Sequence, residues 1–549
     1  AAELEATAER AQRRAGYAGA SAALERAAEL TEDPARKAAR LASAAVAAAD
    51  AGQPERAKRL IERAAPLVTE VRSRVRLSEL RARIAFDEGA PYLAHDLLVG
   101  GARELSALPE DADRVAAGMM LVDAARNAWQ LSDPGRVGEA ADRLHALGLR
   151  PQDGLDPAVR AVTGAAVLLD KGPADALPIM RGLVANGKAI GEGAHALRIN
   201  AAFVATLVGD FRTGRDISAA VAYECRTNGE IGKLPLVHLT LASAELYLGR
   251  FRDAVATATE GLQLASDTGQ PNRAGYLEGV LAWIAAAQGE GERCAELAAR
   301  SRDRFDANRI ANDLAWAEWA LALLDLGQGR FAEAYDRLGA AMTGPVRHQI
   351  QAVYFAPDQI EAATRLGVPA REPLRRFEEW ARASGLSWAE AVLQRCRALL
   401  EPAWDRAHEH FREALRLHAD GERPWEAART GLAFGERLRR ERNKGSARPH
   451  LRAALETFDR LGARPWAERA RTELRAAGDT SSAATSESVL PALSPQELQI
   501  VRLAAKGLTN REIGSQLFLS PKTVSYHLYR AFPKLNVASR AQLAGLELT

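Results

Sequence analysis

The sequence predicts an all-α protein of two parts: a right-handed superhelix of helical repeats, then a small four-helix domain that contains a helix-turn-helix. Three observations support this fold class. Glycines recur every 40 residues in the middle of the chain, helix-start signals cluster in the last fifty-odd residues, and 26% of the 549 residues are charged while only 6% are aromatic. The predicted boundaries are 1–477 for the repeats, 478–492 for a flexible linker and 493–549 for the C-terminal domain.

The repeated unit is expected to be a hairpin of two helices. Gly209, Gly249, Gly289 and Gly329 follow one another at intervals of 40 residues. An alanine stands seven residues before each glycine, a small residue stands five after it, and a phenylalanine stands two after it in three of the copies. The glycine can end one helix, the aromatic residue begins the next, and the small residues let both helices approach closely.

Fainter copies of this pattern lie upstream, around Gly52, Gly89 and Gly164. The phase is lost near 344–373, where we expect a bend or a boundary between sub-arrays, and helical hairpins resume at 401–415 and 450–474. The offsets resemble those of tetratricopeptide repeats, although the period is longer by six residues. This resemblance implies a superhelix of helix pairs with a concave inner face.

The linker and the helix starts after it are marked by local signals. Residues 478–492 begin with a small, polar run that has no periodicity, which is typical of a flexible linker. Gly507 suits the end of the first helix of the C-terminal domain. Four helix starts follow from capping residues: Ser494 with Glu497, Thr509 with Glu512, Ser520 with Pro521, and Ser539 with Gln542.

The third of these helices is predicted to read DNA. Its apolar positions form one stripe, and only two residues separate the second helix from its Ser520 cap, which forces the steep crossing of a helix-turn-helix. A helix in the major groove reads base edges with its outer face. The stripe consists of Val524, Leu528, Ala531 and Leu535, and with it facing inward the outward residues are Lys522, Ser525, Tyr526 and Tyr529, with Arg530 on the flank.

Positive charge concentrates at this end of the chain. Residues 493–549 hold seven basic and three acidic residues, a net charge of +4, whereas the whole chain carries only +2, so the remainder carries −2. The basic residues able to neutralise DNA phosphates are Lys506, Arg511, Lys522, Arg530, Lys534 and Arg540.

The stretch from Leu493 to Leu543 resembles the LuxR-type DNA-binding domain over that domain's whole length. The matching pieces are LS-x-x-E at 493–497, G-L-T-N-R-E-I at 507–513, S-x-K-T-V at 520–524, His527, and K-L-x-V-x-S-R at 534–540. The resemblance implies a third helix in the major groove, with Lys522, Thr523, Ser525, Tyr526 and Tyr529 at the DNA, and a fourth helix that pairs modules into a dimer.

The full predicted DNA-binding set combines these positions with the basic and polar residues around them. For His527, a phosphate contact and a structural hydrogen bond both stay open. Pro533 departs from the family pattern and should kink or end the recognition helix. The set is Thr509, Asn510, Arg511, Lys522, Thr523, Ser525, Tyr526, His527, Tyr529, Arg530 and Lys534.

Other residue patterns in the sequence do not indicate a nucleotide, metal or catalytic site. The run from Gly182 to Lys188 nearly spells a phosphate-binding loop, but Ala189 stands where a magnesium-holding hydroxyl is needed. His408 and His410 point to different helix faces, and the three cysteines are isolated, which indicates neither a zinc site nor a disulfide framework. Because no catalytic triad or carboxylate pair is recognisable, we expect no enzyme activity and no cofactor.

The pairing of array and module resembles the large ATP-binding regulators of the LuxR family, which carry an N-terminal ATPase domain that this sequence does not contain. ATP is therefore expected only if such a domain belongs to the protein. The first residues contain no methionine and begin inside a helix-like pattern, which suggests a fragment or a processed chain.

The expected function is a sequence-specific, cytoplasmic transcription regulator. The array would sense or relay a signal from a protein or small-molecule effector, and the module would bind double-stranded promoter DNA as a homodimer. A membrane role is not expected, because no run of about eighteen apolar residues occurs. The alternative is a repeat scaffold for protein–protein assembly whose tail serves in dimerisation, and salt-dependent DNA binding would distinguish the two.

Overall fold

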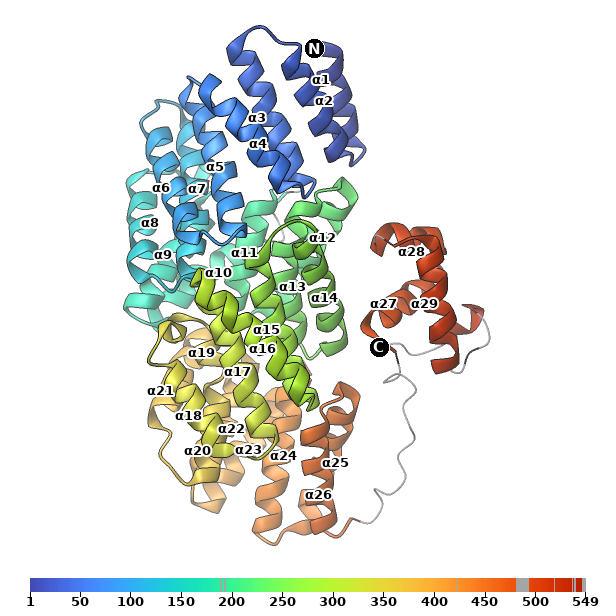
Figure 1. Cartoon of the computed structure of the whole chain (residues 1–549). Helices are drawn as coiled ribbons and strands as arrows, with labels where there is room; N and C mark the ends of the chain where they lie inside the picture. Colours follow the sequence, from blue (N-terminus) through green and yellow to red (C-terminus); the bar gives the residue numbers. More distant parts are fainter. Residues whose placement is uncertain are drawn as a thin grey trace.

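The computed structural model describes residues 1–187, 190–191, 194–421, 423–479, 493–517, 519–535, 537 and 540–545, and over these residues its regular structure is entirely helical (Figure 1). The predicted fold class is confirmed. Tetratricopeptide-like hairpins from α1 to α26 wind into a superhelix, and a helix-turn-helix module from α27 to η8 follows.

The first part of the superhelix contains α1 (Ala2–Arg13), α2 (Tyr17–Glu29), α3 (Pro34–Asp50), α4 (Pro54–Ala64), the 3₁₀ helix η1 (Ala65–Leu67), α5 (Val71–Asp87), α6 (Pro91–Ser106), α7 (Asp111–Gln130), α8 (Pro134–Ala146), η2 (Pro151–Asp153), α9 (Asp156–Asp170) and α10 (Pro173–Gly187). Its middle part contains α11 (His195–Val208), α12 (Phe211–Asn228), η3 (Ile231–Lys233), α13 (Leu234–Tyr247), α14 (Phe251–Asp267), α15 (Pro271–Gln288), α16 (Gly291–Asn308), α17 (Ala311–Gly327) and α18 (Phe331–Ala341).

The last part of the superhelix contains η4 (Pro345–His348), α19 (Gln351–Tyr354), α20 (Ala356–Leu366), α21 (Arg371–Ser384), α22 (Ser387–Leu400), α23 (Trp404–Leu417), η5 (His418–Asp420), α24 (Pro424–Arg440), α25 (Lys444–Leu461) and α26 (Arg464–Ala476). The module contains α27 (Pro495–Ala505), α28 (Asn510–Leu517), α29 (Pro521–Lys534) and η8 (Arg540–Gly545). None of the described helices combines the length and apolar character needed to cross a bilayer.

The hairpins form where the sequence supplies start and stop signals. The side chains of Asp33, Asp133 and Asp210 cap α3, α8 and α12 by accepting hydrogen bonds from backbone N–H groups of the first turn. Gly209 ends α11 in a left-handed conformation, with φ at +83°, as the 40-residue pattern predicts. A Cβ atom on Gly214 would lie 3.1 Å from the Cβ atom of Ala205, so a small residue there lets α11 and α12 pack closely.

The segment in which the repeat phase is lost contains irregular structure. Residues 345–354 form the 3₁₀ helix η4 and the single-turn helix α19 in place of a regular hairpin. Val346 and Phe355 are nevertheless fully buried, in the same hydrophobic cluster as the hairpins before and after them. The packing therefore continues through the irregular segment.

Successive turns of the superhelix contact each other through side chains on their loops and helix ends. Arg273 is ion-paired with Asp87 at 2.7 Å, and these residues are 186 positions apart in sequence. The indole of Trp388 donates to the carbonyl of Gly209 (3.2 Å), 179 positions away, and Arg464 donates to the carbonyl of Gln288 (3.0 Å), 176 positions away. One turn of the superhelix therefore takes up roughly 180 residues.

A buried carboxyl on α13 makes the stability of the array depend on pH. Glu245 is 6% exposed and accepts a hydrogen bond from the hydroxyl of Thr257 at 2.7 Å. Burial raises the pKa of Glu245 to about 7, above the ordinary value of 4.5. The folded state therefore holds this proton more tightly than the unfolded state, so stability is complete below pH 4.5 and declines as the pH rises through 7.

We predict that Glu245→Gln raises the free energy of unfolding by about 3 kcal/mol at pH 8.5 and leaves it nearly unchanged at pH 4.5, because the amide keeps the Thr257 hydrogen bond without a charge. Thermal unfolding at both pH values measures the difference. Glu292→Gln, on the exposed side of α16, is the matched control and should change stability equally at both. A gain from Glu245→Gln that does not depend on pH would contradict the prediction.

Candidate nucleic-acid interface

The three longer helices of the module begin at the predicted capping residues. In α27 the backbone N–H of Glu497 donates to the Ser494 hydroxyl (3.2 Å), and that of Ser494 donates to the Glu497 carboxylate (2.8 Å). Thr509 and Glu512 make the same reciprocal pair before α28. Ser520 caps α29 by accepting from the backbone N–H of Thr523 at 3.0 Å. The fourth predicted cap, Ser539, lies outside the described residues.

The module has a hydrophobic core of its own. The predicted stripe from Val524 to Leu535, on α29 and the residue that follows it, is buried in one cluster with side chains of α27, α28 and η8. The buried side chains of this cluster form a group separate from the core of the superhelix. They are Ile500, Val501, Ala504, Ile513, Val524, Leu528, Ala531, Leu535 and Leu543.

The outer face of α29 presents two aromatic side chains to solvent. Tyr529 is 77% exposed and Tyr526 is 56% exposed, although large hydrophobic side chains are normally covered. Lys522 and Ser525 are exposed beside them. The guanidinium group of Arg530 lies 5.8 Å from the ring centroid of Tyr526, which orients the tyrosine. This face has the aromatic, polar and basic groups that read base edges and contact phosphates.

Two of the predicted DNA-binding residues also hold the module together. The Asn510 amide donates to the Ser525 hydroxyl on α29 (2.8 Å), and its oxygen accepts from Arg540 (2.5 Å). Lys534 is ion-paired with Glu497 at 2.6 Å. Burial alone would raise the pKa of Glu497, but Lys534 and the backbone N–H of Ser494 hold it below its ordinary value. Both interactions fix the position of α29 relative to its neighbours.

The other predicted DNA-binding residues lie at the start of α28 or along α29. Thr509 caps α28 and Arg511 is exposed in its first turn. Thr523 is half-buried, with its hydroxyl 2.8 Å from that of Ser520. The ring of His527 packs edge-on against Tyr526, with 5.7 Å between the ring centroids.

The end of the module differs from the prediction. The sequence predicts a fourth helix over Ser539–Leu548, whereas the described part of that segment is the short 3₁₀ helix η8. Arg540 at its start donates hydrogen bonds to the Leu508 carbonyl and to the side-chain oxygen of Asn510. The rest of this predicted dimer helix, residues 546–548, lies outside the described residues. Recognition helix α29 ends at Lys534, one residue after Pro533, as predicted.

The module rests against the superhelix through α27. Arg502 on α27 is ion-paired with Asp253 on α14, and the two helices lie side by side (Figure 1). Burial, and then repulsion from Arg502, lowers the pKa of the neighbouring Arg252. The module is thereby in contact with the middle of the array, more than two hundred residues earlier in the chain.

A cluster in the array that the sequence did not reveal has the composition of a metal site. Side-chain ligand atoms of His195, Cys225 and Glu230 all lie within 4.8 Å of one another. Both nitrogens of the His195 ring already bond to carboxylates, Nε2 to Glu224 (3.1 Å) and Nδ1 to Glu230 (2.9 Å). Cys225 and Glu230 raise the pKa of His195 to about 10. A protonated imidazole is not a metal ligand, so we interpret the cluster as an ion-pair network.

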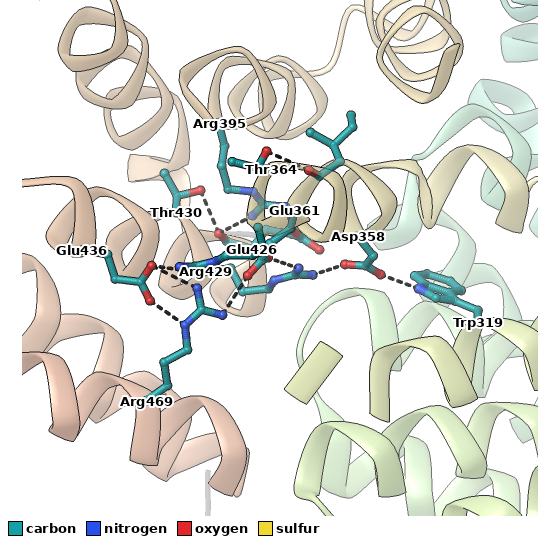
Figure 2. Close-up of polar contacts among 12 residues, drawn as sticks. Trp319, Asp358, Glu361, Thr364, Arg395, Glu426, Arg429, Thr430, Glu436 and Arg469 are labelled. Carbon is teal, nitrogen blue, oxygen red and sulfur yellow. Dashed lines mark hydrogen bonds and ion pairs between the residues drawn. The ribbon is translucent and has the colours of Figure 1, made fainter. Parts of the chain in front are cut away.

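A larger buried network joins helices in the last part of the array. Figure 2 shows Arg429 between two carboxylates on α20: it is ion-paired with Asp358 and, at 2.5 Å, with Glu361. Trp319 donates to the other oxygen of Asp358 (2.6 Å), and Arg469 on α26 bonds to Glu361 at 2.8 Å. Arg429, Asp358 and Glu361 are each less than 9% exposed. Nε of Arg429 has no hydrogen-bond partner within the described residues, but both carboxylates are paired with guanidinium groups, which indicates a structural role for the network.

The near match to a phosphate-binding loop cannot be placed, because Lys188 and Ala189 lie outside the described residues. Gly187 itself ends α10, and the segment before it is helix instead of the strand that such a loop follows.

Comparison with known proteins identifies the module. The sequence profile "GerE: Bacterial regulatory proteins, luxR family" matches residues 491–546. An HTH-type transcriptional regulator of Mycobacterium bovis, Mb0914c, is 40% identical over 100 residues, which are 17% of this chain and 11% of that protein. The Transcriptional regulatory protein LiaR of Bacillus subtilis is 45% identical over 60 residues, 11% of this chain and 28% of that protein. The chain thus spans only about a ninth of the length of the mycobacterial relative.

Among solved structures, the chain is similar to a Rap protein complexed with Competence and Sporulation Factor, with a TM-score of 0.49 and 13% identity over 70% of this chain and 98% of that one.

Proposed function

We propose that the protein is a sequence-specific DNA-binding transcription regulator, with a helical array that senses or relays a signal and a C-terminal module that reads the major groove. The observation that carries the proposal is the outer face of α29, where Tyr526 and Tyr529 are exposed beside Lys522 on a module that matches the luxR family. We place the array at 1–477, the linker at 478–492 and the module at 493–549.

In the proposed complex, the residues of the module have three kinds of role. Tyr526, Tyr529 and Ser525 read base edges, because they stand on the outward face of the helix that enters the groove. Asn510 and Lys534 position α29, and they contact the DNA backbone from the edges of this helix. The contacts to phosphates come from Thr509, Arg511, Lys522, Thr523, His527 and Arg530.

Two modules are proposed to act together on promoter DNA in the cytoplasm. One short helix gives few phosphate contacts, so one copy should bind weakly, and helix-turn-helix proteins gain affinity from two half-sites about one helical turn apart. The fourth-helix segment after Arg540 would form the contact between the two copies. The ion pair between Arg502 and Asp253 gives the array a contact through which its state can influence the module.

The proposal is tested by selecting bound sequences from random double-stranded DNA with the full chain. We expect an enriched motif with two half-sites, cooperative binding of two chains, and an affinity that falls as salt rises. Binding that is insensitive to salt, or the absence of any enriched motif, would contradict the proposal and favour the protein–protein scaffold.

A further inference from the structure

A cavity lies inside the superhelix, where two of its turns meet. Its volume is about 460 Å³, within the range of roughly 300–1,000 Å³ usual for small-molecule sites. Its walls come from α3, α5, α6, α7, α11, η3, α13 and α15, so residues more than two hundred positions apart line one space. The ion pair between Arg273 and Asp87 joins α15 to α5 at its edge.

The walls of this cavity carry more positive than negative charge. Three carboxylates line it, Glu79, Asp87 and Asp123. They face six basic side chains: Arg76, Arg83, Arg126, His195, Lys233 and Arg273.

Ion pairs inside the protein account for only part of this charge. Arg273 is paired with Asp87 (2.7 Å) and Arg126 with Asp123 (3.1 Å). Two more pairs use carboxylates outside the cavity lining: Arg83 with Asp50 (2.9 Å) and Lys233 with Glu230 (3.0 Å). Arg76 makes no ion pair with any residue that the structure describes. Arg76 is therefore an exposed cation of the cavity wall that interacts with the charge of Glu79 but has no direct ion pair.

Two basic residues of the wall also keep unused hydrogen-bond donors. Nη2 of Arg83 and Nε of Arg126 are buried and have no hydrogen-bond partner within the described residues. A buried donor without an acceptor is costly, and an acceptor from outside the protein, such as water or an anion, is one way to satisfy it. Burial, and then the charge of Asp123, raises the pKa of Glu79, while Arg83 and Arg76 act in the opposite direction.

The remaining walls are apolar. Val46, Leu80, Phe86, Leu98, Ile199 and Leu236 line the cavity between the charged groups. Small-molecule sites typically combine such apolar walls with a few convergent polar groups that fix the orientation of the ligand.

From these contacts we infer that the cavity binds a small organic anion, a molecule with an apolar body and one carboxylate or phosphate group that Arg76, Arg83 and Arg126 receive. The inference adds a binding site and a ligand class to the proposed sensing array. The regulatory role of this ligand rests on the proposed function. Because the ligand would contact α5 and α15 together, it would bridge consecutive turns of the superhelix.

The test uses the full chain without DNA and four probes of one size: benzoate, phenyl phosphate, benzyl alcohol and benzylamine. Binding at millimolar concentrations is measured by calorimetry and by ligand-observed NMR. We expect one or both anions to bind. The one that binds more tightly shows whether the site prefers a carboxylate or a phosphate group. The neutral and cationic probes should bind at least tenfold more weakly, because the wall is basic.

Two variants and one control locate the site. Arg76→Glu reverses the unpaired charge, and Ala196→Trp fills the cavity from its α11 wall. Each should weaken binding of the anion by roughly thirtyfold or more. Arg81→Glu makes the same change on the same helix at an exposed position that does not line the cavity, and it should bind as the unmodified chain does.

The inference is overturned if neither anion binds, if benzylamine binds as tightly as the anions, or if Arg76→Glu and Arg81→Glu have equal effects. These outcomes are separate from a failure of the proposed function, because the selection experiment reports DNA binding and needs no ligand. If the chain selects DNA but binds no anion, the proposed regulatory function stands and the proposed ligand site is contradicted.

Discussion

Replacing Arg429 with methionine should lower the free energy of unfolding of the array by about 3–5 kcal/mol. Arg429 is 4% exposed and lies between the carboxylates of Asp358 and Glu361, which are themselves buried (Figure 2). Without the guanidinium, two negative charges remain in a low-dielectric interior with too little counter-charge. The loss is measured by urea and thermal unfolding of the full chain.

The matched control is Arg416→Met. Arg416 is also paired with a carboxylate, Glu413 at 2.6 Å, but its side chain is 68% exposed, and the change should cost less than about 1 kcal/mol. Combining Arg429→Met with Asp358→Asn and Glu361→Gln removes the stranded charges and should restore much of the stability. Equal losses from Arg429→Met and Arg416→Met would show that the network is not what stabilises this region.

Tyr526→Ala and Tyr529→Ala should change which DNA sites are bound, whereas Lys522→Ala should weaken binding to all sites. The tyrosines extend from the outer face of α29, and loss of a base-reading side chain costs about 1–3 kcal/mol of discrimination between sequences. A lost phosphate contact mainly lowers the dependence of affinity on salt, by about one unit of the logarithmic slope. Affinity for the selected site and for random DNA is measured at several salt concentrations.

Tyr223→Ala is the matched control for the tyrosine variants. Tyr223 on α12 is 68% exposed, comparable with the two tyrosines of α29, but it lies in the array and should leave DNA binding unchanged. If the α29 variants lose affinity equally for selected and random DNA, the tyrosines do not read bases.

Much of the array could be predicted from the sequence because its determinants are local. Gly209 and Gly289 end helices in the left-handed conformation, and Phe211 begins the next helix, as the 40-residue spacing predicts. The caps at Ser494, Thr509 and Ser520 were predictable for the same reason, since each depends on residues three positions away. Periodicity and caps identify hairpins and the buried face of each helix.

The rest depends on residues that are far apart in sequence. The anion cavity needs Arg76 and Arg273 to lie on facing walls, and the buried network needs Asp358 to meet Arg429 across 71 positions. No local pattern predicts such pairs, because the pitch of the superhelix decides which turns meet. Asp358 and Glu361 also lie in the stretch where the repeat phase is lost, so the 40-residue pattern predicts no ion pairs for them.

The contacts between turns also determine how the chain can assemble during translation. Each bond between turns joins residues roughly 180 positions apart, and ribosomes add about 5–20 residues per second, so the later partner emerges roughly 10–40 seconds after the earlier one. During that interval the loops of the earlier turn, such as the one around Gly52, have no neighbour to cover them. The loops of one turn are thus buried only after the next turn has been synthesised. A nascent chain that stalls within a turn therefore exposes these loops to chaperones and proteases.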